Sequence, residues 1–138
     1  MASKARVVID TNVLVSALLM PRSLPRESID RVRSTGKILI SSATLAELDD
    51  VLRRPRFDKY IQEEERLKFL AAFVRDAQLV QATANVTDCR DPRDNKFFEL
   101  AVSGNADVII SGDKDLLVLH PFRGISVLTP QDFLTQPR

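Results

Sequence analysis

The sequence predicts a three-layer α/β/α sandwich with a central, mainly parallel sheet. Short β-branched runs alternate with amphipathic stretches of helical length, the pattern of parallel strands joined by right-handed helical crossovers. The chain has 138 residues, the size of one domain, so we expect a single domain over residues 1–138. With 44% hydrophobic residues it can bury an ordinary core rather than stay disordered.

The first elements form a strand–helix–helix–strand unit. The β-branched run at residues 6–9 predicts a strand that leads directly into a helix over 13–20. Two prolines interrupt the pattern before a second helix over 26–35, which Gly36 ends. The apolar run 38–40 is typical of another buried strand.

Two more helices are expected next. Ser41 or Ser42 can cap a helix that stops at Arg54, because Pro55 follows. An apolar stripe at helical spacing indicates a helix over 62–75. The stripe consists of Leu67, Leu70, Ala71 and Val74.

The middle of the chain is less regular. Residues 79–80 favour a short strand, and the polar stretch 82–90 favours a loop. Asp91 is placed to cap the following helix, with Pro92 at its first position, and that helix ends near Gly104.

The last part of the chain returns to the strand–helix rhythm. Residues 107–110 form the clearest predicted strand and run into 111–115 before a short helical segment. Residues 125–128 predict a final strand. Thr129 then opens a C-terminal helix that continues through Leu134.

Charge and cysteine content exclude several classes of protein. The net charge of +1 argues against a surface coated in positive charge for indiscriminate nucleic-acid binding, although a local patch can still engage phosphates. Cys89 is the only cysteine, so no internal disulfide forms. No apolar run reaches the roughly 20 residues of a membrane span, and no secretory signal is evident. We therefore expect a cytoplasmic protein with no membrane contact.

Acidic side chains directly follow two of the predicted strands. Asp10 comes after 6–9, and Asp113 comes after 107–110. Ligands of such sheets bind beyond the carboxyl ends of the strands, where parallel strands present their turns together. The alternative, which the sequence leaves open, is that these residues only cap the following helices.

Two further acids lie on predicted helices. Glu47 is roughly 40° from Val51 around the helix, at the edge of its apolar stripe. Its alternative is a residue at the rim whose carboxylate stays in water. Asp94 shares a side with Phe97 and Phe98, which are expected to face the sheet. Its alternative is a favourable interaction with the helix N-terminus.

These acids suggest a metal site. Two unit charges 4 Å apart repel by about 4 kcal/mol at an effective dielectric of 20, so clustered carboxylates take up protons or bind cations. Oxygen ligands favour Mg²⁺ or Mn²⁺, whereas zinc sites usually need more than the available Cys89 and His120. The candidate ligands are Asp10, Glu47, Asp94 and Asp113, with Asp115 and Asp91 nearby.

A pair of carboxylate-held divalent ions suits phosphodiester hydrolysis, because it activates water and stabilises the attacking and leaving oxygens. Thr11, Asn12 and Ser111 can hydrogen-bond metal-bound water or orient the carboxylates. The candidate contacts to a polyanion are Lys96, Lys114, Arg53, Arg54 and Arg56. Their alternative is an ordinary solvated helix surface, with cations at a helix C-terminus.

The chain resembles the PIN-domain ribonucleases, particularly the VapC-like toxins of bacterial toxin–antitoxin pairs. The resemblance rests on the order and spacing of four motifs, and residues 125–134 resemble the end of one subgroup of toxins. The motifs are Val8-Ile9-Asp10-Thr11-Asn12, Thr44-Leu45-Ala46-Glu47-Leu48, Asp91-Pro92-Arg93-Asp94-Asn95-Lys96 and Ile110-Ser111-Gly112-Asp113-Lys114-Asp115.

The resemblance implies a PIN-like nuclease domain that cleaves RNA with Mg²⁺ or Mn²⁺. It implies that Asp10, Glu47, Asp94 and Asp113 are the catalytic, metal-binding acids, with Asp115 as an additional ligand. Ser111 stands at the family's customary hydroxyl position. A homodimer and an inhibitory antitoxin protein are the implied partners.

Other classes stay open at this stage. One is a PIN fold that only binds a partner and keeps its acids for a stabilising ion. Another is a phosphotransfer enzyme of the haloacid-dehalogenase type, which needs an aspartate where Asn12 stands. A receiver-like signalling module needs paired acids after the first strand, and only Asp10 is present there.

Overall fold

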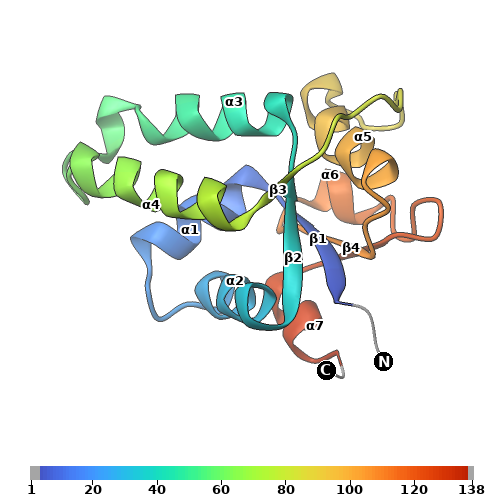
Figure 1. Ribbon diagram of the computed structural model, residues 1–138, viewed down its shortest axis with the longest axis horizontal. Coiled ribbons are helices and arrows are strands. Elements are labelled where there is room, and N and C mark those ends of the chain that lie inside the picture. Colours follow the sequence, from blue (N-terminus) through green and yellow to red (C-terminus); the bar gives the residue numbers. More distant parts are fainter. Residues whose placement is uncertain (1–3, 137–138) are drawn as a thin grey trace.

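The computed structural model describes residues 4–136 and contains one parallel sheet of five strands (Figure 1). The strand order is β3-β2-β1-β4-β5, and each neighbouring pair is parallel. The strands are β1 (Ala5–Ile9), β2 (Gly36–Ile40), β3 (Gln78–Leu79), β4 (Val108–Ile110) and β5 (Ser126–Leu128). The predicted α/β sandwich is confirmed.

Helices connect successive strands, with two short 3₁₀ turns before α4 and α5. The α-helices are α1 (Thr11–Leu19), α2 (Leu24–Thr35), α3 (Ser42–Leu52), α4 (Glu63–Asp76), α5 (Asn95–Ser103), α6 (Lys114–Leu117) and α7 (Pro130–Leu134). The 3₁₀ turns are Pro55–Phe57 and Pro92–Asp94.

Alternating side chains of the strands build two separate cores, one on each face of the sheet. Val7 and Ile9 of β1 join a core with residues of α1, α2, α3 and α4. Val8 points to the other face and joins a core with residues of α5 and α6. Helices therefore cover both faces, which makes the three layers.

Several helix starts differ from the sequence prediction, two of them beside predicted site residues. The helix expected at 13–20 begins at Thr11, because Asp10 itself is the N-cap. The helix expected from Asp91 begins with a 3₁₀ turn, and its α-helical part starts at Asn95. Asp91 still caps that turn by accepting a bond from the Arg93 amide.

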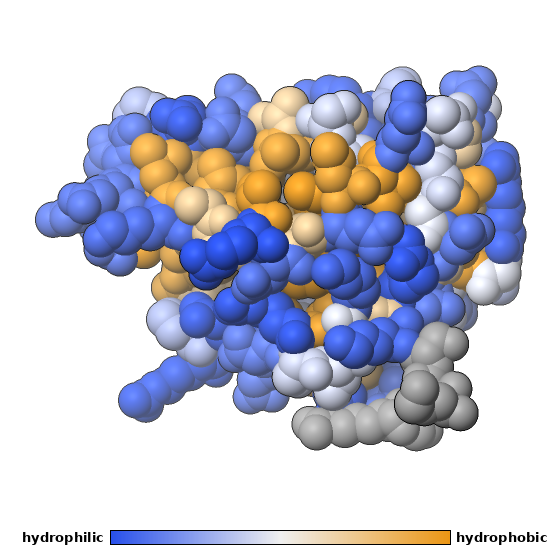
Figure 2. All heavy atoms as spheres, in the orientation of Figure 1, coloured by the Kyte–Doolittle hydropathy of each residue, from blue (hydrophilic) through white to orange (hydrophobic). Residues whose placement is uncertain are grey.

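The predicted inner face of α4 is wrong in part. Leu70 and Val74 do pack on the core, but Ala71 is exposed, and the fully enclosed side chains are Arg66 and Phe73. A stripe defined by apolar residues excludes arginine. The predicted buried face of α4 is therefore displaced around the helix from the observed one. Figure 2 shows that apolar surface remains over α3 and α4.

Helix α7 is only five residues long and depends on α2 for its position. The Arg31 guanidinium of α2 donates to the carbonyl oxygens of Leu134 at 3.0 Å and Gln136 at 3.4 Å. It also lies 6.0 Å from the centre of the Phe133 ring. Arg31 therefore holds the C-terminal end of α7 against the body of the molecule.

Within residues 4–136, no helix combines the length and apolar character needed to cross a membrane.

Candidate active site

The carboxyl ends of β1 and β4 bring Asp10 and Asp113 to one edge of the sheet. The two strands are adjacent and parallel, and the Asp10 amide donates to the Ile110 carbonyl at 2.9 Å. Ser111 links the two turns, because its hydroxyl donates to Asp10 Oδ2 at 2.7 Å and accepts from the Asp113 amide at 3.0 Å. Ser111 is fully buried, so this link is shielded from water.

Both aspartates cap the helices that follow them, as the alternative weighed for them expects. Asp10 Oδ1 accepts from the Asn12 amide at 3.4 Å, and Asp113 Oδ1 accepts from the Asp115 amide at 2.9 Å. Each cap uses one carboxylate oxygen. Capping fixes the orientation of both side chains and leaves the second oxygen of Asp113 without a hydrogen bond from residues 4–136.

Glu47 reaches the same region from α3 and is held at both oxygens. The Thr11 hydroxyl donates to Oε2, and Lys96 Nζ lies 2.8 Å from Oε1. The Glu47 side chain is 28% exposed and the Lys96 side chain 22%. Glu47 is thus fixed between α1, α3 and α5 rather than solvated at the rim.

Asp94 stands where the 3₁₀ turn meets α5, and its carboxylate accepts no hydrogen bond from residues 4–136. Partial burial is the main cause that raises its pKa to about 6, and the charges of Asp91, Asp10, Asp113 and Glu47 add to the effect. The helix N-terminus alone does not account for Asp94, because that interaction favours the charged form.

The pKa of Asp10 is also raised, first by burial and then by Glu47 and Asp113. Hydrogen bonds from Ser111 and the Asn12 amide partly oppose this shift. The charges of Glu47 and Asp113 therefore reach both Asp10 and Asp94, although the four residues come from separate segments. We call these four residues the acidic cluster.

The chemistry of the acidic cluster fits a divalent cation, but its side chains are not yet arranged around one. Among residues 4–136, no group of three or more carboxylate, histidine or cysteine side chains could hold a metal ion as they stand. Its oxygen ligands suit Mg²⁺ or Mn²⁺.

Other predicted site residues lie close by with different contacts. Asn12 is exposed, and only its backbone amide bonds to the acidic cluster. Asp115 lies in the first turn of α6, 3.8 Å from Arg90. Lys114 is exposed at the start of the same helix.

The basic segment after α3 is not brought to the acidic cluster. Arg53 pairs with Asp49 at 3.0 Å, and Arg54 pairs with Asp50 at 3.0 Å. The Arg56 guanidinium lies 4.8 Å from the Phe57 ring centre. Because α3 runs away from the carboxyl edge of the sheet (Figure 1), these residues fit the alternative of a charged helix end.

Sequence reasoning missed the pairing of Lys96 with Glu47. The two residues are 49 positions apart, so no local pattern joins them. One signal was available in the sequence. Lys96 is two residues after Asp94, so it lies on the segment that brings this acid to the site.

The parallel sheet with the acidic cluster at its carboxyl edge defines a class of α/β proteins. Comparison with known families identifies the family within that class. The sequence profile of the PIN domain matches residues 6–115. The chain therefore belongs to the PIN-domain family. It is also 34% identical to the uncharacterized protein MJ1680 of Methanocaldococcus jannaschii, over 96% of this chain and 92% of that protein.

Solved structures share the fold at low sequence identity. VapBC2 from Rickettsia felis, bound to a DNA fragment from its promoter, superposes with a TM-score of 0.61 at 15% identity, covering 88% of this chain and 96% of that one. DNA-bound VapBC from Salmonella typhimurium has a TM-score of 0.60 at 18% identity, with coverage of 91% and 98%. PAE2754 from Pyrobaculum aerophilum has a TM-score of 0.61 at 12% identity, with coverage of 94% and 88%.

Proposed function

We propose that this PIN-domain protein is an endoribonuclease that requires Mg²⁺ or Mn²⁺. The observation that supports it is the acidic cluster, in which burial and mutual repulsion oppose ionisation of Asp10 and Asp94. A cation at this place relieves the repulsion. The acidic cluster also lies at the carboxyl edge of the sheet, where substrates of such folds bind.

Asp10, Asp94, Asp113 and Glu47 are the side chains that would hold the ion, and Glu47 would give up its ion pair with Lys96 to do so. When bound, Mg²⁺ or Mn²⁺ activates water and stabilises the oxygens of an in-line displacement at phosphorus. The Asp94 carboxylate accepts no hydrogen bond from residues 4–136, so it would give up none of these on holding the ion.

The surrounding side chains orient these acids. Ser111 holds Asp10 through its hydroxyl, and Thr11 holds Glu47 in the same way. Lys96 balances the charge of Glu47 before a cation binds. Once separated from Glu47, its ammonium group is free to bind a phosphate oxygen of RNA.

The test is cleavage of labelled RNA by purified protein with Mg²⁺, with Mn²⁺ and with EDTA. We expect cleavage only with the metal ions, and a loss of at least about a hundredfold in Asp94→Asn, because a bound ion contributes several kcal/mol to the transition state. Asp30→Asn, a change at an exposed position on α2, should cleave at the wild-type rate. Cleavage that persists in both EDTA and Asp94→Asn would contradict the proposal.

We further propose that the protein acts as the toxin of a toxin–antitoxin pair, in the cytoplasm and as a homodimer. The support is the structural likeness to two VapBC complexes. Co-purification with the product of a small neighbouring reading frame, and loss of RNA cleavage in that complex, would test the partner. Light scattering of the free protein would test the dimer, for which a mass near twice 15.5 kDa is expected.

A binding module without catalysis is the second candidate. The Lys96–Glu47 ion pair favours it, because a lysine already neutralises one of the four acids. That function predicts RNA binding at micromolar protein without cleavage at any metal concentration.

A further inference from the structure

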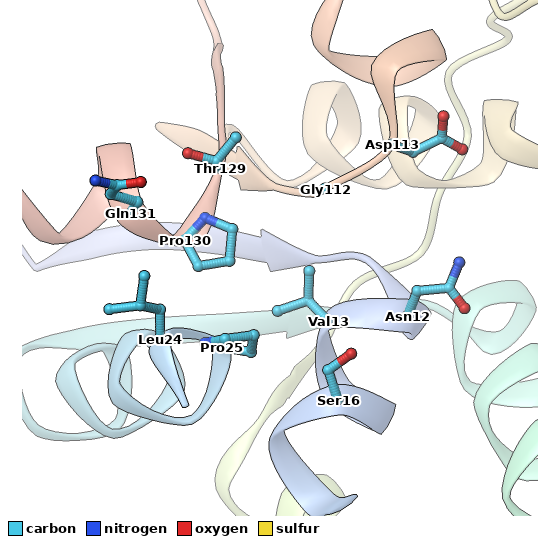
Figure 3. A pocket seen from close by; sticks show the side chains of 10 residues that line it. All are labelled: Asn12, Val13, Ser16, Leu24, Pro25, Gly112, Asp113, Thr129, Pro130 and Gln131. Atoms are coloured by element: carbon cyan, nitrogen blue, oxygen red, sulfur yellow. The ribbon is translucent and has the colours of Figure 1, made fainter. Parts of the chain in front are cut away.

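A cavity of about 560 Å³ opens beside the acidic cluster. Its lining comes from α1, the start of α2, the turn after β4 and the start of α7. Figure 3 shows Asn12 and Asp113 at one end of the cavity and Leu24 and Gln131 at the other. The volume lies within the roughly 300–1,000 Å³ typical of small-molecule pockets. The cavity is thus an extension of the candidate active site rather than a separate surface feature.

The lining suits a neutral, flat group rather than a phosphate. Its walls are apolar at Val13, Pro25 and Pro130, and none of the lysines and arginines among residues 4–136 lines it. Hydroxyl and amide groups, including those of Ser16 and Gln131, supply both donors and acceptors. An RNA base has apolar faces and a hydrogen-bonding edge, which match this combination.

Gly112 lies where the acidic cluster meets the cavity. A Cβ atom built on this glycine meets no atom of residues 4–136 within 4 Å, so Gly112 faces open space. Gly112 separates Ser111, which holds Asp10, from Asp113, which lines the cavity. A nucleotide whose phosphate lies at the acidic cluster therefore has room to turn its base into the cavity.

We propose that this cavity binds the base of a nucleotide next to the cleaved phosphodiester and thereby selects the RNA sequence. The proposal rests on the ribonuclease function proposed above. Asp113 marks the boundary between the two parts of the site, with metal and phosphate on one side and the base on the other. Ser16 and Gln131 are the residues that recognise the base edge.

The first experiment measures base binding without catalysis. Adenosine, guanosine, cytidine and uridine are each added to ¹⁵N-labelled protein in EDTA, and amide chemical shifts are followed. We expect at least one nucleoside to shift Val13, Gly112 and Gln131. Ser16→Leu fills the cavity and should abolish these shifts, whereas Ser34→Leu, the same change at an exposed position on α2, should leave them unchanged.

The second experiment measures cleavage of RNA with an abasic nucleotide on either side of the cut. For the wild type we expect kcat/KM to fall roughly tenfold or more when the selected base is missing. Ser16→Leu should cleave the complete and abasic RNA equally slowly. Gln131→Ala, an exposed change that leaves the fold intact, should alter which base is preferred.

The outcomes separate this proposal from the ribonuclease function. Cleavage of RNA without nucleoside shifts, or with equal rates on complete and abasic RNA, would overturn the base site alone and favour a protein partner in the cavity. Nucleoside shifts at Val13 and Gly112 without cleavage of any RNA would overturn the ribonuclease function and with it the role next to a cut bond. Thermal melting of Ser16→Leu shows whether this variant is folded. Gln131→Ala changes an exposed position and therefore tests base recognition without a folding defect.

Discussion

Asp94 illustrates how one side chain can report the state of the whole acidic cluster. Its pKa of about 6 in the folded protein lies above the ordinary value of 3.8. The folded state therefore binds more protons than the unfolded chain between about pH 4 and pH 6, and stability falls as pH rises through that window. Below about pH 4 both states are protonated, and the penalty disappears.

This shift predicts a pH-dependent difference between the wild type and Asp94→Asn. In EDTA at pH 7, Asp94→Asn should be the more stable by on the order of 1 kcal/mol, a figure reduced for solvent screening at a partly exposed group. The advantage should shrink toward zero as pH falls from 7 to 4. Urea denaturation at several pH values measures it, and an advantage that grows in acid would show that the sign is wrong.

The four acids of the cluster were predictable because each has a local signature. Asp10 and Asp113 follow buried strands, and Glu47 and Asp94 lie beside apolar helix positions. The contacts of the basic residues were not predictable. The sequence of an arginine-rich segment does not show whether its side chains face a substrate or form ion pairs with acids of the same helix. Arg53 and Arg54 do the latter.

At the scale of elements, Arg66 joins α3 to α4. Its guanidinium is fully buried and donates to the Leu52 and Ile61 carbonyl oxygens, each at 2.8 Å, and to Asp58 at 2.8 Å. The Leu52 carbonyl belongs to the last turn of α3, which leaves it without a partner inside that helix. A charged side chain is tolerated here because its hydrogen bonds are satisfied.

Arg66→Leu should therefore destabilise the protein by about 3 kcal/mol, because the buried Leu52 carbonyl and the part-buried Ile61 carbonyl lose their donor. Lys68→Leu on the same helix, where the lysine side chain is 66% exposed, should change stability by less than about 0.5 kcal/mol. The free energy of unfolding in urea compares the two. A cost for Arg66→Leu as small as that for Lys68→Leu would mean that the buried bonds contribute little.

The order of elements was predictable from sequence, whereas the face of α4 was not. The spacing of apolar residues predicts which segments are strands and which are helices. Pro55 and Gly36 mark the ends of helices, because proline and glycine interrupt regular backbone structure. The buried side of α4 depends on the hydrogen bond from Arg66 to the Leu52 carbonyl of α3. This is a tertiary contact, which no local sequence pattern shows. The same holds for the cavity, whose lining is drawn from helix starts far apart in the chain.

For the molecule as a whole, metal binding and folding should be linked. A ligand that binds only the native state adds about 2.7 kcal/mol of stability when present at a hundred times its dissociation constant. We expect millimolar Mg²⁺ or Mn²⁺ to raise the melting temperature by a few degrees. The rise should be smaller in Asp94→Asn and unchanged in Asp30→Asn.

Differential scanning calorimetry with and without EDTA measures this linkage. Equal melting temperatures with and without either ion would contradict a metal site at the acidic cluster, even if the protein bound RNA. The result would then favour the binding module.

The attachment of α7 through Arg31 has a practical consequence for engineering. Residues 129–136 contribute Pro130 and Gln131 to the cavity, and they are held by the Arg31 bonds to backbone carbonyls and by the Phe133 ring, which packs against the core. A segment that keeps an aromatic residue at the position of Phe133 can consequently replace this one while the sheet and the acids stay untouched. On the proposed ribonuclease function and base site, exchanging this segment is therefore a route to changing which RNA sequence is selected, with the acidic cluster kept constant.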